Sequence, residues 1–156
     1  MGTSDKIINR WLVVVGAILI QLCLGAIYAW SVFTPYLTGK LPDPENSFNF
    51  TKTQTQVIFS VGLAAFALVM VFAGKWQAKS GPRKVAMAGG IMSGLGYVLG
   101  GLLGQSFIAQ VIFIGLIGGA GIGLGYVCPI SVGMKWFPDK KGLITGLAVA
   151  GFGFGA

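Results

Sequence analysis

Long apolar runs alternate with short polar segments along the whole chain. A membrane-spanning helix needs about 20 mostly apolar residues, and four runs are long enough. They cover approximately 11–37, 53–73, 85–103 and 107–134. A fifth run begins near Gly142 and is still apolar at Ala156, so we expect a fifth helix, 142–156, that is cut off in mid-span. The pattern predicts an all-α membrane protein.

The absence of charge inside these runs strengthens that prediction. Residues 11–37, 53–73 and 85–134 contain no charged side chain, and a charge that faces lipid is costly. A transmembrane β-barrel would need alternating apolar and polar residues in segments of about ten, and this alternation is absent. Helices satisfy every backbone polar group within the segment, so a helical bundle is expected.

Lysine and arginine alternate between rich and poor connections. Nine of the 11 basic residues fall in the N-terminal segment and in the connections 74–84 and 135–141; the connection 38–52 has the other two. Basic residues concentrate on the cytoplasmic side of membrane proteins. The sequence therefore predicts a multi-pass protein of the cell membrane with a cytoplasmic N-terminus.

Composition excludes several other classes of protein. Only 10% of the 156 residues are charged, against about 25% in soluble domains. The net charge of +7 lies in short loops, whereas nucleic-acid binding needs a contiguous basic patch. There is no histidine, and Cys23 and Cys128 lie in apolar runs, where we expect both to be buried. We therefore expect no nucleic acid, no metal, no cofactor and no enzyme activity, since no nucleophile–base pair or carboxylate dyad is evident.

Polar residues inside the spans are the candidate site residues. Such side chains either face a watery cavity or find hydrogen-bond partners on neighbouring helices, and the sequence leaves both roles open. Gln21 and Tyr28 are seven residues apart and so share roughly one helix face. The residues that we expect at a substrate site are Tyr28 and Tyr126 first, then Gln21 and Trp30.

Glycines recur at intervals of four residues in the third and fourth runs. This spacing places them on one helix face, where a neighbouring helix can approach closely. The packing could be static or could allow helices to shift, and the sequence does not separate the two. The sets are Gly96, Gly100 and Gly104; Gly115, Gly119 and Gly123; and Gly121 and Gly125.

The connection 74–84 resembles a signature of the major facilitator superfamily, G-x-x-x-D-R-x-G-R-R/K, between the second and third helices. Gly74, Gly81 and Arg83 match, and Lys79 replaces an arginine. Ala78 stands where the family has an aspartate. In the family this aspartate joins a charge-relay and helix-cap arrangement that holds one conformation shut, so the resemblance does not extend to that latch.

Two further segments are similar to the oxalate/formate antiporter branch of that superfamily and to the neighbouring monocarboxylate transporters. They are Leu-Gly-Ala-Ile-Tyr-Ala-Trp-Ser-Val-Phe at 24–33 and Lys-Trp-Phe-Pro-Asp-Lys-Lys-Gly-Leu-Ile-Thr-Gly at 135–146. The resemblance covers essentially the whole chain but only about the first five helices of a twelve-helix bundle. The chain would be an incomplete N-terminal transmembrane domain.

The resemblance implies a secondary active transporter of small mono- or dicarboxylates such as lactate, pyruvate, formate or oxalate. It would work by alternating access, as an antiporter or a proton symporter, with a central site between two halves. In this branch aromatic residues of the first and fourth helices line that site, which fits Tyr28 and Tyr126. The basic residues that pair with the carboxylate would belong to the missing C-terminal half.

Two alternatives remain at this point. The chain could come from a drug or sugar exporter of the same superfamily. It could also be a small four-helix membrane scaffold or channel subunit, which would need no second half.

Overall fold

The structure is a computed structural model that describes residues 10–40, 48–103 and 105–155. The described residues are helical and contain no strand, so the predicted all-α architecture is confirmed. Four continuous stretches are long and apolar enough to cross a membrane, judged by length and composition. These stretches are Arg10–Leu37, Lys52–Ser80, Pro82–Leu103 and Phe107–Trp136.

Two of the four spans are not uniform α-helices. The first consists of α1 (Arg10–Leu24), a 3₁₀ segment (Gly25–Ala29) and α2 (Trp30–Leu37). The fourth consists of α5 (Phe107–Gln110), a π-helical stretch (Val111–Gly118) and α6 (Gly119–Trp136). Irregular turns within membrane helices often mark functional positions.

The second and third spans are longer than the sequence predicted. α3 (Lys52–Ser80) starts at a capping box, in which the Gln54 backbone N–H donates to Thr51 Oγ1 and the Thr51 N–H donates to Gln54 Oε1. It continues seven residues past the expected end at 73, through Gly74, and ends at Ser80 with Gly81 as its C-cap. Gly81 adopts φ +84°, and Pro82 then occupies the first position of α4 (Pro82–Leu103). The predicted connection 74–84 is therefore helical except at Gly81.

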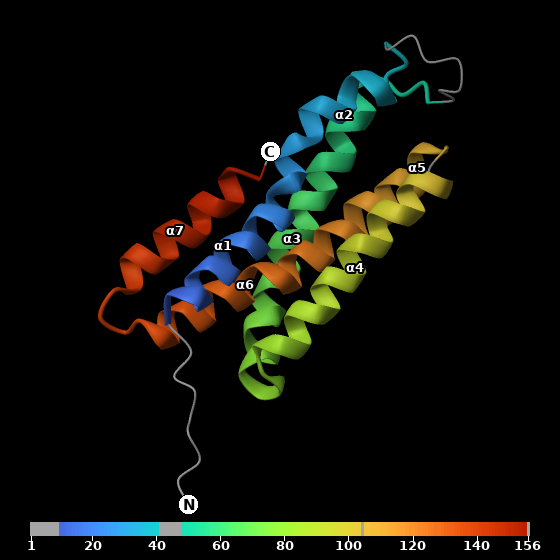
Figure 1. The fold of residues 1–156 in the computed structure, drawn as a ribbon. Helices are drawn as coiled ribbons and strands as arrows, with labels where there is room; N and C mark the ends of the chain where they lie inside the picture. Colours follow the sequence, from blue (N-terminus) through green and yellow to red (C-terminus); the bar gives the residue numbers. More distant parts are fainter. Residues whose placement is uncertain (1–9, 41–47, 104, 156) are drawn as a thin grey trace, which may run out of the picture.

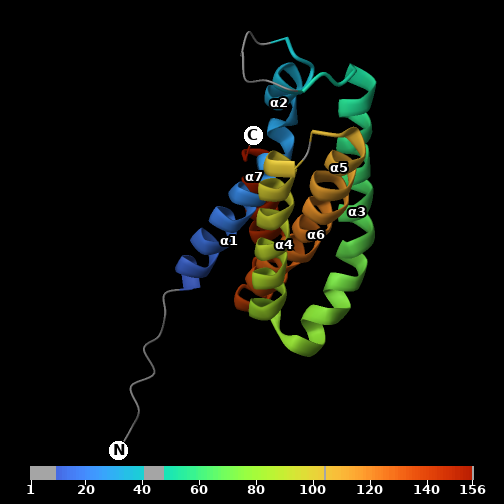
Figure 2. The same ribbon diagram turned by 90° about the vertical axis from the view of Figure 1, so that its right-hand side faces the viewer.

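Helix α6 is the centre of the bundle. It packs against α1, α3, α4 and α7 (Lys141–Gly153). In Figure 1, α7 lies along one flank of the bundle and α4 along the opposite flank. In the view turned by 90°, α6 lies between α3 and the pair α1 and α4 (Figure 2). The residues of α6 thus face four different helices.

Glycines bring α6 into backbone contact with α4. A Cβ atom on Gly89 would lie 2.6 Å from the Gly125 nitrogen and 2.7 Å from the Gly121 oxygen. A Cβ on Gly96 would lie 2.6 Å from the oxygen of Phe113, in the π-helical stretch that precedes α6. We call this interface between α4 and the fourth span the glycine seam. The four-residue spacing in the sequence predicted close packing, and the backbones do meet along these faces.

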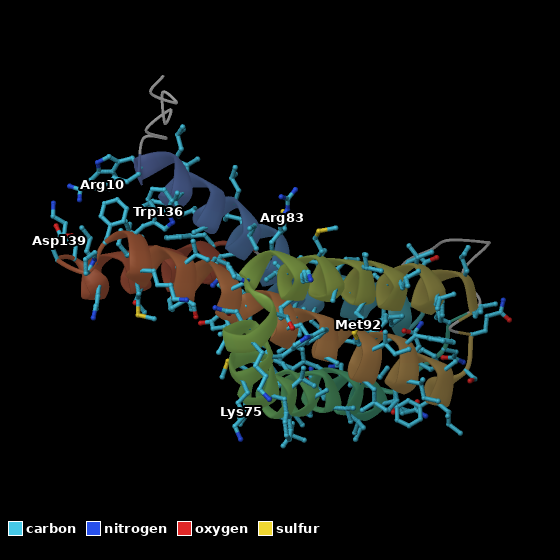
Figure 3. All side chains as sticks on the ribbon, turned by 90° about the horizontal axis from the view of Figure 1, so that it is seen from below. Arg10, Lys75, Arg83, Met92, Trp136 and Asp139 are labelled. Atoms are coloured by element: carbon cyan, nitrogen blue, oxygen red, sulfur yellow. The ribbon has the colours of Figure 1, made fainter. Side chains whose placement is uncertain are left out.

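Large apolar side chains are exposed over much of the outer surface. Val32, Leu68, Phe72 and Leu102 are each more than 60% exposed. A water-soluble monomer rarely exposes so much contiguous apolar surface, whereas lipid would cover it. The two ends of the bundle differ in charge. The start of α1, the α3–α4 turn and the α6–α7 connection lie at the same end and carry most of the described basic residues. We call this the basic end; in Figure 3 it carries Arg10, Lys75 and Arg83.

Candidate substrate site

The 3₁₀ segment Gly25–Ala29 brings α1 unusually close to α7. A Cβ atom on Gly25 would overlap the carbonyl oxygen of Phe152, so only glycine fits at this crossing. Tyr28 lies on the same segment, three residues later. The tighter winding of this segment therefore presents Tyr28 next to the end of α7.

Four aromatic rings from four different helices meet at this point. Phe152 lies 5.2 Å from Tyr28 and 4.9 Å from Tyr126 between ring centroids, both edge to face. Phe66 lies 5.3 Å from Tyr126, also edge to face, and 6.1 Å from Phe152 in a stacked arrangement. These distances are within the range at which aromatic pairs attract one another. We call Tyr28, Phe66, Tyr126 and Phe152 the aromatic cluster.

The cluster is closed on one side and open on the other. Phe152 is 6% exposed and packs with the buried core residues Leu24, Ile27 and Ile122. Tyr28 is 45% exposed, so one side of the cluster is accessible. The arrangement offers ring faces and edges together with two phenol hydroxyls, which can donate to an oxygen-bearing ligand.

Gln21 lies on α1 next to Tyr126 of the cluster and is fully buried. Its Nε2 donates to the backbone oxygen of Tyr126 at 3.3 Å, which links α1 to α6. Its Oε1 is buried and has no hydrogen-bond partner among the described residues. In this conformation the Gln21 side chain reaches the backbone of Tyr126 and is shielded from the open side of the cluster.

Trp30 lies farther along the first span, in a separate core. It is 7% exposed, its Nε1 donates to the Thr55 backbone oxygen at 3.0 Å, and its ring stacks on Phe59 at 6.4 Å. It packs with Leu37 and Ile58. Of the four expected site residues, Tyr28, Gln21 and Tyr126 come together, whereas Trp30 joins α2 to α3.

The signature residues lie at the turn between α3 and α4. The Gly81 N–H donates to the Gln77 oxygen at 2.9 Å and closes α3. Gly74, Lys79 and Arg83 are exposed. Arg83 also borders a groove of about 370 Å³ that is lined by apolar side chains of α1, α4 and α6. The turn therefore presents its basic side chains on the surface of the basic end.

The two cysteines differ in exposure. Cys128 is buried, but the expectation that Cys23 is buried is wrong, because Cys23 is exposed on α1. It borders a furrow of about 640 Å³ between α1 and α4 that none of the four expected site residues lines. Within the described ranges no three metal-ligating side chains gather.

Phe66 and Phe152 were not among the predicted site residues, because the prediction rested on polar side chains within apolar spans. A phenylalanine in the cluster cannot be told by type from a lipid-facing one such as Phe72, which is 66% exposed. Phe152 does have one local signal, since it follows directly on Gly151 in a run of small residues.

The family model of the Major Facilitator Superfamily matches residues 19–156. The chain belongs to the major facilitator superfamily. It is 36% identical to an uncharacterised transporter of that type, YhjX of Escherichia coli K12, over 100% of this chain and 37% of that protein. It is 28% identical to apicoplast pyruvate carrier 1 of Toxoplasma gondii, over 99% of this chain and 35% of the carrier. It is 27% identical to the oxalate:formate antiporter of Oxalobacter formigenes, over 94% of this chain and 33% of the antiporter.

The chain thus spans about a third of the length of these relatives. As a member of the major facilitator superfamily it is a multi-pass membrane protein of a transporter family, not of an enzyme family. The resemblance found in segments 24–33, 74–84 and 135–146 is confirmed at the level of the superfamily, and monocarboxylate transporters are also among the relatives.

Proposed function

We propose that the protein transports small mono- or dicarboxylates across the membrane by alternating access, as an antiporter or a proton symporter. One observation carries the proposal: two tyrosines from the first and fourth spans meet in an aromatic cluster that is open on one side. The relatives include proteins named for pyruvate, for oxalate and formate, and for monocarboxylates, which supports the same substrate class.

The chemistry of the cluster suits part of a carboxylate. The hydroxyls of Tyr28 and Tyr126 can donate to carboxylate oxygens, and hydrogen bonds to charged groups are stronger than neutral ones. The ring edges of Phe66 and Phe152 carry partial positive charge and can contact the same anion. Gln21 and Trp30 are the other two proposed substrate-binding residues. Gln21 would act through its hydrogen bond to the Tyr126 backbone, and Trp30 from the neighbouring core.

Hydroxyl groups alone do not neutralise a buried anion. A carboxylate in a membrane needs a basic partner, and 11–37, 53–73 and 85–134 contain no lysine or arginine. We infer that this partner belongs to a C-terminal half of the transporter, packed against the open side of the cluster. Protons are the second proposed partner, if transport is symport.

The basic end supplies the proposed orientation. Eight basic residues occur at the described starts and ends of spans on this side, whereas Lys40 and Lys52 lie on the opposite side. By the positive-inside rule the basic end faces the cytoplasm, in the plasma membrane. The turn with Gly74, Lys79, Gly81 and Arg83 would then change its contacts as the two halves rock. The aspartate that latches this turn in the family is replaced by Ala78.

Uptake by the full-length protein in proteoliposomes tests the proposal. We expect saturable uptake or exchange of radiolabelled lactate, pyruvate, formate or oxalate. Runs with and without an imposed pH gradient separate symport from antiport. Absence of saturable transport for all four acids would reject the substrate class and leave the family assignment unaffected.

A drug or sugar exporter is the alternative within the same superfamily. A thermal-shift panel that compares carboxylates, sugars and lipophilic cations distinguishes them, because a ligand that binds the folded state raises Tm. Stabilisation by sugars or cations but not by carboxylates would favour the exporter.

A further inference from the structure

We propose that Gln21 is a positioning residue that sets the distance between Tyr126 and Phe152, the two rings at the centre of the aromatic cluster. This inference rests on the proposed function, because it assigns to Gln21 a role in shaping that site. The contacts that carry it come from α1, α6 and α7.

Helix α1 packs on two glycines, and each glycine directly precedes a ring of the cluster. On α6, a Cβ atom on Gly125 would lie 3.0 Å from Leu24 Cδ1, and the next residue is Tyr126. On α7, a Cβ on Gly151 would lie 3.5 Å from Gln21 Cβ, and the next residue is Phe152. The face of α1 that carries Gln21 therefore determines where both rings stand.

Gln21 is a polar residue of this face that reaches both helices. Its stem lies against Gly151 of α7, while its Nε2 donates to the backbone oxygen of Tyr126 at 3.3 Å. A hydrogen bond fixes direction as well as distance. Removing the bond would leave the spacing of Tyr126 and Phe152, now 4.9 Å between ring centroids, to apolar packing alone.

The unpaired oxygen of Gln21 makes it possible to test a positioning role against a purely structural one. Gln21 Oε1 is buried with no partner in the part of the chain that the structure describes. A buried polar atom without a partner loses its hydration and gains nothing in return. Methionine has a similar length and no such atom. If Gln21 served packing alone, methionine at this position would therefore keep both stability and transport.

The test replaces Gln21 by methionine in the full-length protein and measures transport and stability together. We expect Gln21→Met to raise KM for the transported carboxylate about tenfold, with kcat less affected and Tm unchanged or higher. If that variant is not recovered folded, Gln21→Asn serves the same purpose. Its amide is one methylene shorter and cannot span the gap to Tyr126.

Gln110→Met is the matched control. Gln110 is also buried, and its Nε2 donates to the Gly100 backbone oxygen at 3.1 Å, which links α5 to α4 away from the cluster. We expect this variant to leave KM unchanged. An unchanged KM in Gln21→Met, or an equal rise of KM in Gln110→Met, would overturn the proposal.

A second readout does not depend on the substrate. Tetranitromethane nitrates tyrosine rings, and mass spectrometry locates the product at Tyr126 or Tyr28. We expect faster nitration of Tyr126 in Gln21→Met than in the wild type or in Gln110→Met. If the wild type transports no carboxylate, the proposed function fails and nitration alone decides the positioning role, with equal rates rejecting it.

Discussion

Helix α6 meets its neighbours in two different ways on its two sides. Along the glycine seam, the backbones of α4 and α6 touch, with the Cβ position of Gly89 only 2.6 Å from the Gly125 nitrogen. Towards α1 and α7, side chains make the contact: aromatic rings, the amide of Gln21, and Leu24 against Gly125. Backbone contact leaves no rotamers to adjust, whereas rings and amides can turn. The comparison suggests that α4 and α6 move as one unit and that any adjustment to a substrate occurs on the α1 and α7 side.

The largest expected effect comes from adding one methyl group to the glycine seam. Gly89→Ala places a carbon where the Gly125 nitrogen and the Gly121 oxygen leave no room. We expect a loss of about 2–3 kcal/mol in the free energy of unfolding, as for other overpacked cores. Thermal unfolding in detergent, followed by tryptophan fluorescence, measures the change.

The neighbouring glycine provides the control. A Cβ on Gly90 would meet nothing within 4 Å. Gly90→Ala is therefore expected to leave Tm unchanged or raise it, because alanine favours a helix over glycine by up to about 1 kcal/mol. Equal Tm losses in both variants would show that the seam is no tighter than the rest of α4.

An intermediate effect is expected on the other side of α6, on transport and not on stability. Tyr126→Phe keeps the ring contacts and removes one hydroxyl donor. If that hydroxyl binds the carboxylate, KM rises about tenfold, which corresponds to about 1.4 kcal/mol. Tyr97→Phe on α4 is the control, since Tyr97 borders the furrow between α1 and α4. Uptake kinetics in proteoliposomes compare the two, and equal KM values would remove Tyr126 from the site.

The two sides also differ in how far the sequence predicted them. Glycines four residues apart indicated close helix packing, because spacing alone places them on one face. Of these glycines, Gly96, Gly121 and Gly125 lie in the glycine seam, whereas Gly115, Gly119 and Gly123 contact α3. The aromatic cluster was half predicted. Tyr28 and Tyr126 stood out as polar residues in apolar spans, whereas Phe66 and Phe152 are of the same type as lipid-facing residues such as Phe154, which is 80% exposed.

The polarity of a side chain did not show where it points. Gln21 and Trp30 are polar residues within an apolar span, as the tyrosines are, yet both donate to backbone oxygens of neighbouring helices. The 3₁₀ segment Gly25–Ala29, where Gly25 meets the Phe152 carbonyl of α7, was not predicted either. The local sequence predicts the length of a span well. It contains little information on contacts between residues more than a hundred positions apart.

The smallest effect is expected where α1 meets the α6–α7 connection at the basic end. Arg10, Trp136 and Asp139 lie together there (Figure 3). The Arg10 and Asp139 side chains are 4.0 Å apart and each is 51% exposed, so the pair contributes about 0.2–1 kcal/mol at most. Arg10 also lies 4.9 Å from the centre of the Phe137 ring, and Trp11 lies 5.2 Å from that ring.

Asp139→Asn tests whether side-chain packing or charge holds this end of α1. Phe137 is fully buried with Val14 and Ile144, and the substitution leaves that core intact. We expect a barely measurable fall in Tm at low salt and none at high salt, where screening removes the difference. Phe137→Ala, the packing control, should instead lower Tm equally at low and at high salt, because it removes a buried apolar side chain. A large, salt-sensitive loss in Asp139→Asn would mean that charge fixes α1 against α7, and the α1 side of α6 would then be held more firmly than rings and one amide imply.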